Sequence, residues 1–223
     1  YVQESVYDDF VNRVVEQVKN VKQGWDTKGE FDIGCLASQD QVKIVEDHIE
    51  DAVRKGAKIL TGGKRKGKTL FFEPTVIVNV DHSMKIMREE TFGPVVSIMK
   101  FTTEEEVVKL ANYSVYGLNE SLWTKDKTNA LRVSSRIITG GISINNAIML
   151  QANFTLPYGG VKQSGFGRYH GSYGLHTFSN IKAVIIEKGK KPKEINWYPF
   201  RADKYQRFLR TFQSLFSEKT MAK

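Results

Sequence analysis

One cysteine is the first candidate for chemistry in this 223-residue chain, because a thiolate is a strong nucleophile where its pKa is lowered. Cys35 is the only thiol, and it lies in the connecting stretch Ile33-Gly34-Cys35-Leu36. A cysteine in such a stretch is more often a small hydrophobe than a nucleophile. We therefore expect Cys35 to be buried and chemically silent.

The histidines and a glycine-rich stretch are the next candidates. Zinc-type ligand spacing is absent from the four histidines, His48, His82, His170 and His176, so metal binding is not expected. Residues 151–167 contain Pro157 and four glycines without periodicity, and the stretch is too long for a simple connection. We predict a functional loop there. The neighbouring His170 is expected to be packed or on the surface, with a pocket role as the alternative.

Helices and strands must position these residues, and their patterns alternate along the chain. Apolar residues with helical spacing predict helices that begin near Ser5, Ser38, Thr103 and Thr128, and the second and third have capping-box spacing. Short apolar or β-branched runs predict strands at 57–60, 75–80, 94–101, 121–124, 142–144 and 181–187. This alternation predicts an α/β fold with a mainly parallel sheet and helices on both faces.

The end of the chain differs from the rest in its pattern. A charged linker at 189–193 precedes a stretch in which an aromatic stripe faces away from Lys204, Arg207 and Arg210. We predict a main domain at 1–180, a strand and linker at 181–190, and a basic amphipathic helix within 191–223. Packing of the aromatic stripe on protein is favoured over an interfacial membrane helix.

The composition excludes several classes of protein. No apolar run is long enough for a membrane span, no secretory leader is visible, and one cysteine excludes an internal disulfide, so we expect a cytoplasmic protein. The formal charge of +8 raises nucleic acid as a partner, for example through the basic residues at 64–68. A solvated loop explains that cluster, and nucleic-acid binding is not expected. Because the first residue is Tyr1, we expect further sequence upstream.

Three motifs in fixed order resemble the aldehyde dehydrogenase superfamily. Residues 89–94 (EETFGP) resemble its E-x-F-G-P element, 112–118 (NYSVYGL) its N-x-x-x-Y-G-L turn, and 156–168 (LPYGGVKQSGFGR) its P-F-G-G-x-K-x-S-G-x-G-R signature. The similarity extends from Tyr1 to about Glu187 and corresponds to the C-terminal part of the catalytic domain. The spacing from Asn145 to Tyr158 and the runs at 167–171 and 177–179 resemble the branch that oxidises medium- and long-chain aldehydes.

The resemblance implies roles for three residues. Glu90 would bind the ribose hydroxyls of the nicotinamide half of NAD(P), and Phe92 would flank the nicotinamide ring. An ionised carboxylate can accept both hydrogen bonds of such a diol. Tyr158 replaces the usual phenylalanine in the wall of the aldehyde pocket, where its hydroxyl adds a polar group.

The second motif is expected to be structural. At the end of a helix, Gly117 would relieve left-handed backbone strain, and Tyr116 and Leu118 would enter the core. No catalytic role is assigned to this turn.

The resemblance also implies a reaction for which this chain lacks parts. In the family, a cysteine thiolate attacks the aldehyde to form a thiohemiacetal, hydride passes to NAD or NADP, and a water activated by a glutamate hydrolyses the thioester. The nucleophile, the general base and the nucleotide site lie upstream of the segment that resembles Tyr1-Val2-Gln3. We therefore expect a full-length parent that is an NAD(P)-dependent aldehyde dehydrogenase, with this chain alone inactive and binding cofactor weakly or not at all.

Two further expectations concern partners and the alternative function. Family members form dimers through the strand equivalent to residues 181–187, so a homo-oligomer is expected, with a small-molecule aldehyde as substrate. The alternative to an enzyme is a non-catalytic, aldehyde-dehydrogenase-like binding or structural protein.

Overall fold

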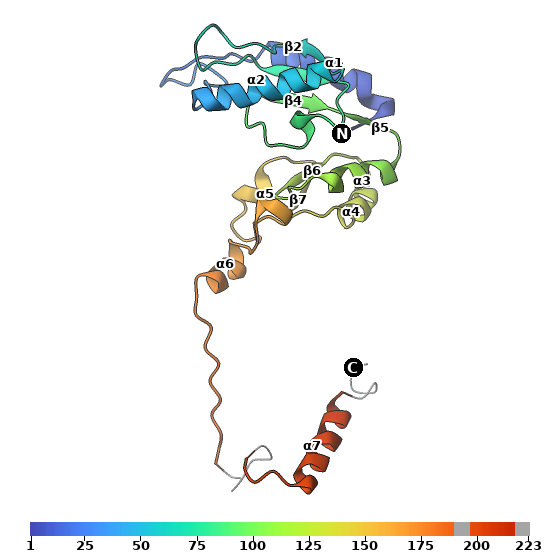
Figure 1. The fold of residues 1–223 in the computed structure, drawn as a ribbon, viewed down its shortest axis with the longest axis vertical. Helices are drawn as coiled ribbons and strands as arrows, with labels where there is room; N and C mark the ends of the chain where they lie inside the picture. Colours follow the sequence, from blue (N-terminus) through green and yellow to red (C-terminus); the bar gives the residue numbers. More distant parts are fainter. Residues whose placement is uncertain (190–196, 217–223) are drawn as a thin grey trace. The chain divides into compact units, whose positions relative to one another are not determined.

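The chain forms two compact units, Tyr1–Ser179 (unit 1) and Asn180–Lys223 (unit 2), in a computed structural model that describes residues 1–189 and 197–216 (Figure 1). The helices of unit 1 are α1 (Glu4–Lys19), α2 (Gln39–Arg54), α3 (Glu104–Tyr113), α4 (Lys127–Ser134), α5 (Met149–Ala152) and α6 (Gly171–Thr177), with the short 3-10 helices η1 (Lys85–Met87) and η2 (Lys162–Ser164). Its strands are β1 (Val2–Gln3), β2 (Lys58–Thr61), β3 (Thr75–Val78), β4 (Val95–Ile98), β5 (Lys100–Phe101), β6 (Glu120–Leu122) and β7 (Ile142–Ile144). In unit 2, α7 spans Ala202–Leu215.

The strands of unit 1 pair mainly in parallel, as predicted, but they are divided among small sheets. The pairs β1–β5, β3–β4 and β6–β7 are parallel, while β2 runs antiparallel to β3. The run 94–101, expected as one strand, is split at Met99 into β4 and β5, which belong to different sheets. The predicted α/β class is confirmed.

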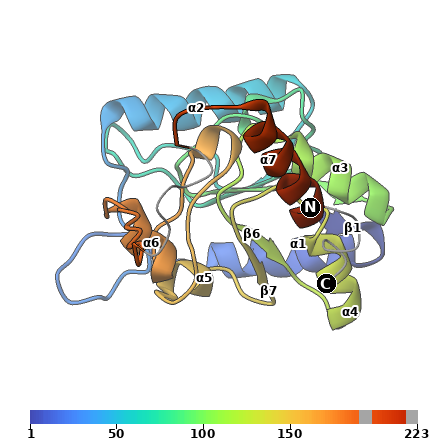
Figure 2. The same cartoon turned by 90° about the horizontal axis from the view of Figure 1, so that it is seen from below.

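Strand β3 is the centre of the fold, because helices cover both of its faces. Val76 and Val78 pack with α1 through Val11, whereas Ile77 belongs to the cluster that α2 completes with Val45. Alternate residues of a strand point to opposite faces, so four consecutive apolar or β-branched residues can serve two layers. Figure 2 shows α1 and α2 on opposite sides of this part of unit 1.

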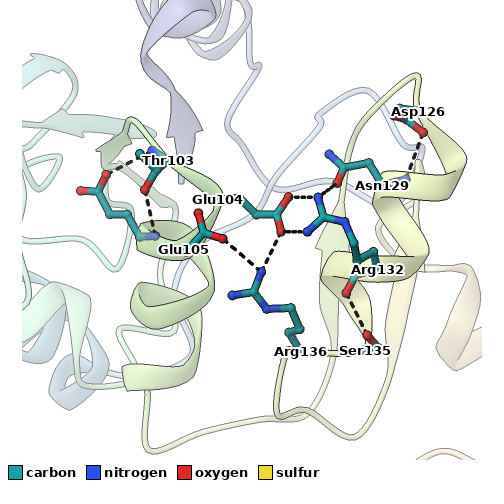
Figure 3. Close-up of polar contacts among 9 residues, drawn as sticks. Thr103, Glu104, Glu105, Asp126, Asn129, Arg132, Ser135 and Arg136 are labelled. Carbon is teal, nitrogen blue, oxygen red and sulfur yellow. Dashed lines mark hydrogen bonds and ion pairs between the residues drawn. The ribbon is translucent and has the colours of Figure 1, made fainter.

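The second part of unit 1, residues 102–179, has a much smaller core. Its buried side chains among the described residues are Val108, Ala130, Val133, Ser143 and Tyr158. A polar junction joins α3 to α4 instead (Figure 3): Arg132 holds the Glu104 carboxylate with both terminal nitrogens, and Arg136 lies 2.7 Å from it. The hydrogen bond from Arg132 is the main cause that lowers the pKa of Glu104.

The N-termini of two helices are capped largely as predicted. Thr103 and Glu106 form the complete capping box of α3. At α2 the Ser38 hydroxyl accepts a hydrogen bond from the Gln41 amide, but the Gln41 side chain does not reach back to Ser38. It binds the backbone of Thr91 and Phe92 instead.

Unit 2 departs from one sequence prediction. Residues 181–187 were expected as a strand, yet no backbone hydrogen bond joins them to any described segment, and they are exposed. The prediction is wrong for the single chain, because β-branched residues favour an extended backbone while a strand also needs a neighbour to pair with. The prediction that this segment pairs with another chain stays a prediction.

A helix, α7, lies within the segment for which a basic amphipathic helix is predicted, and its aromatic rings stack along it. Phe208 stacks on Phe212 at 6.2 Å between ring centres, and Phe212 lies 4.5 Å from Phe216. No residue of α7 is buried by the described residues. None of the helices in the described ranges combines the length and apolar character that a membrane crossing requires.

Candidate cofactor and substrate site

One face of α2 holds the motif at residues 89–94. Gln41, Val45 and His48 are spaced by four and three residues, so their side chains lie on the same face of the helix. The Gln41 side-chain amide donates to the carbonyl oxygens of Thr91, at 2.7 Å, and of Phe92, at 3.2 Å. The motif is thus attached to α2 through its backbone.

Two further contacts, one within the motif and one just before it, hold this part of the chain against α2. A Cβ on Gly93 would lie 2.5 Å from a Val45 methyl group, so only glycine permits this approach. Before the motif, the Lys85 amide donates to the buried Asp51 carboxylate at 2.8 Å. That hydrogen bond, followed by the one from Lys55, lowers the pKa of Asp51 to about 2.

The two residues to which the family resemblance gives a cofactor role are presented outward. Glu90 is exposed, and among the described residues its carboxylate has no hydrogen-bond or ion-pair partner. Phe92 is 76% exposed and has a backbone φ of +44°, which an aromatic residue rarely adopts. Strained, exposed residues that the surrounding structure holds in place are typical of binding sites.

Phe92 and Cys35 line the same shallow hollow, which has a volume of about 460 Å³. Cys35 is exposed, so the expectation of a buried thiol is wrong. The physical reason is that its neighbour takes the inward place: Leu36 packs on the core and donates its amide to the Leu70 carbonyl oxygen at 3.0 Å. The remaining lining residues are Gln23, Ile33, Gly34, Leu36, Gly93 and Pro94, and none of them is basic.

The third motif folds back on itself around Tyr158, which is only 6% exposed. Tyr158 and Tyr169 exchange backbone hydrogen bonds of 2.7 and 2.9 Å, and their rings meet edge to face at 5.5 Å. The Arg168 guanidinium donates to the Gly160 carbonyl oxygen at 2.8 Å. His170 completes this aromatic cluster, 4.5 Å from the Tyr169 ring centre, which agrees with the expectation of a packed histidine. Tyr158 does not line the hollow beside Cys35, whereas Phe92 and the two residues after it do.

The second motif, at residues 112–118, forms hydrogen bonds with the third motif, at residues 156–168. The Lys162 ammonium donates to the carbonyl oxygens of Asn112 and Ser114, at 3.0 and 2.8 Å, and the Gly117 amide donates to the Ser164 hydroxyl at 3.0 Å. A Cβ on Gly117 would lie 2.9 Å from the Val161 side chain. This turn therefore has the structural role that was predicted.

Two details of that prediction are wrong. Gly117 does not have a positive φ, because α3 already ends at Tyr113, and close approach is what requires the glycine. Tyr116 and Leu118 are exposed rather than in the core, because few buried side chains exist here to pack against.

Among the described residues no group of three or more histidine, cysteine, aspartate or glutamate side chains could hold a metal ion.

Comparison with known proteins identifies the family. The aldehyde dehydrogenase family model matches residues 1–184. The chain belongs to the aldehyde dehydrogenase family. It is 39% identical over 221 residues to 4,4'-diapolycopene aldehyde oxidase of Methylomonas sp, covering 99% of this chain and 41% of that protein. It is 42% identical over 188 residues to succinate-semialdehyde dehydrogenase [NADP(+)] 1 of Schizosaccharomyces pombe, covering 83% and 37%.

A solved aldehyde dehydrogenase structure supports the same assignment. Betaine aldehyde dehydrogenase from Staphylococcus aureus, in complex with NAD+, matches with a TM-score of 0.78 and 36% identity over 89% of this chain and 40% of that one. The resemblance inferred from the three motifs is confirmed. This member of the aldehyde dehydrogenase family spans about two fifths of the length of these relatives.

Proposed function

We propose that this chain is the C-terminal part of the catalytic domain of an NAD(P)-dependent aldehyde dehydrogenase. The full-length enzyme oxidises an aldehyde to a carboxylic acid through a cysteine thiohemiacetal. The observation that carries the proposal is the outward display of Glu90 and Phe92 on a loop that α2 holds in place. The relatives named above supply the class of reaction.

The residues present fit the nicotinamide half of the cofactor. Glu90 has an exposed carboxylate without a partner among the described residues, so it can accept hydrogen bonds from both hydroxyls of a ribose. Phe92 offers an exposed aromatic surface beside an apolar hollow. When bound, the nicotinamide accepts the hydride of the substrate. The protein side chains orient the ribose and limit the poses of the ring.

Cys35 is not the nucleophile in this proposal. A catalytic thiolate is stabilised by nearby positive charge, a helix N-terminus or a histidine. The hollow that Cys35 lines holds neutral and apolar residues instead. The nucleophile and the general base are therefore assigned to sequence outside this chain, and the chain alone is expected to produce no NADH or NADPH.

The aldehyde is proposed to be of medium or long chain, as the resemblance of residues 167–171 and 177–179 suggests, with Tyr158 in the pocket wall. A comparison of decanal with succinate semialdehyde tests this choice. The full-length enzyme should have the higher kcat/KM for decanal, and a preference for succinate semialdehyde would contradict the proposal.

The test of the cofactor site is Glu90→Gln in the full-length protein that carries this chain. Loss of the carboxylate weakens hydrogen bonds to the ribose, and a hydrogen bond to a charged group is worth about 1.5–3 kcal/mol. The KM for NAD or NADP should rise at least about tenfold, and the hydride step should slow more than hydrolysis of a thioester intermediate. Pre-steady-state NADH formation and esterase activity measure the two steps separately.

The control is Glu50→Gln, which removes an exposed carboxylate of α2 that is not part of the motif. It should leave both steps unchanged. A non-catalytic protein is the alternative, and it would be favoured if the full-length protein bound neither NAD nor NADP. Production of NADH by this chain alone, abolished by Cys35→Ala, would overturn the assignment of the nucleophile.

A further inference from the structure

A buried histidine contacts both neighbours of Glu90. His48 is 3% exposed, and its Nδ1 atom lies 3.1 Å from the Thr91 hydroxyl oxygen. Its Nε2 atom lies 3.5 Å from a carboxylate oxygen of Glu89. The two contacts therefore fall on the residues immediately before and after Glu90.

The two partners of His48 determine which of its ring nitrogens carries the hydrogen. An ionised carboxylate only accepts hydrogen bonds, so the hydrogen on Nε2 faces Glu89. In the neutral ring Nδ1 then has a free lone pair and accepts the hydroxyl hydrogen of Thr91. Nδ1 thereby has a hydrogen-bond partner, and Nε2 faces the Glu89 carboxylate at 3.5 Å.

We propose that His48 is a positioning residue that holds the side chains on both sides of Glu90, limits the movement of the backbone between them, and so aims the Glu90 carboxylate at the cofactor ribose. The inference rests on the proposed function, in which Glu90 binds that ribose. His48 itself does not touch the cofactor.

The loop that carries Glu90 explains why a positioning residue is needed. Glu90 is exposed and has no partner of its own among the described residues, so only its backbone can define where the carboxylate points. The Gln41 amide holds the carbonyl oxygens of Thr91 and Phe92, but these lie after Glu90. His48 adds the contact with Glu89 before it and holds the Thr91 side chain after it. A ligand group that is held in the bound geometry loses less freedom on binding.

The experiment measures the cofactor KM of the full-length enzyme that carries this chain. His48→Phe fills the same buried space without either polar contact, and Thr91→Val removes only the hydroxyl. Each should raise the KM for NAD or NADP about fivefold, the effect of losing one ordinary hydrogen bond. The aldehyde KM should stay unchanged. Thr91→Ser retains the hydroxyl and should restore most of the wild-type cofactor KM.

A double-mutant cycle with Glu90→Ala decides whether the effect passes through Glu90. The proposal expects that Glu90→Ala raises the cofactor KM and that His48→Phe or Thr91→Val then adds nothing. An equal fivefold effect with and without the Glu90 carboxylate would overturn the positioning role, although Glu90 would keep its own. If Glu90→Ala leaves the cofactor KM unchanged, the proposed function of Glu90 fails first.

The two Thr91 variants keep the proposal testable if His48→Phe does not fold. Thr91 is only partly buried, so its variants should retain the wild-type melting temperature. A Thr91→Val enzyme with an unchanged cofactor KM would overturn the proposal without any use of the His48 variant.

Discussion

Strand β3 and residues 181–187 have similar amino acids and opposite surroundings. β3 reads Thr-Val-Ile-Val, is paired on both edges by β2 and β4, and is buried throughout. Residues 181–187 read Ile-Lys-Ala-Val-Ile-Ile-Glu, but they have no strand partner among the described residues and are exposed. β-Branched residues thus predict the extended backbone in both places, while pairing and burial depend on what lies alongside.

The difference shows what an unpaired apolar strand segment implies. Exposed edges with apolar side chains invite association with another chain. The alternating pattern of 181–187 is incomplete, since Val184, Ile185 and Ile186 follow one another. Such a run suits a segment that is covered on both faces after pairing. This is the physical basis for the prediction of a homo-oligomer.

The largest effect is expected from truncation within β3. Ile77→Ala removes a fully buried side chain between two layers and should lower the free energy of unfolding by about 2–5 kcal/mol. Ile186→Ala changes the same residue type at a position that is 89% exposed, and should alter monomer stability by less than about 0.5 kcal/mol. Urea denaturation of this chain at low concentration measures both. Equal losses would mean that residues 181–187 are packed in the monomer.

The second prediction concerns association through residues 181–187. Ile185→Pro removes one backbone hydrogen-bond donor from the segment, so it should weaken a dimer by about 0.5–1.5 kcal/mol, roughly two- to tenfold in its dissociation constant. Light scattering coupled to size-exclusion chromatography measures the mass against concentration. Lys188→Ala, which changes an exposed residue just after the segment, is the control and should leave the dimer intact. A wild-type chain that stays monomeric at high concentration would contradict the prediction.

The sequence predicted the elements of this fold better than their partners. Helical spacing located α1, α2 and α3, and the Thr103–Glu106 box was correct because capping involves only neighbouring residues. Gln41 also had capping-box spacing, but its side chain binds Thr91 and Phe92, fifty residues away, which local rules cannot show. The exposure of Cys35 likewise depends on how Leu36 packs on a distant core.

The candidate site was predictable only in part, because sequence motifs do not show contacts between distant residues. The three motifs located Glu90, Phe92 and Tyr158 in the sequence, but not the side chains that support them. His48 lacks zinc-type spacing, but its spacing from Gln41 and Val45 places it on one face of a helix with them. A polar residue on the buried face of a helix needs a partner, and that requirement was the available signal.

The smallest effect is expected at the polar junction of α3 and α4, where ion pairs take the place of the apolar contacts that surround β3. Arg132 and Arg136 lower the pKa of Glu104 below its ordinary value of 4.5, with the hydrogen bond from Arg132 as the main cause. A carboxyl whose pKa is lower in the folded state adds stability above its unfolded pKa and loses it as the pH falls through its folded pKa.

Glu104→Gln should therefore melt at a slightly lower temperature than the wild type at pH 7. The difference should shrink below about pH 4.5 and vanish once Glu104 is protonated in the folded chain. Glu16→Gln, an exposed carboxyl of α1, is the matched control. Melting curves from pH 3 to pH 7 test the prediction, and a difference that persists at the lowest pH would show that packing, rather than charge, joins these two helices.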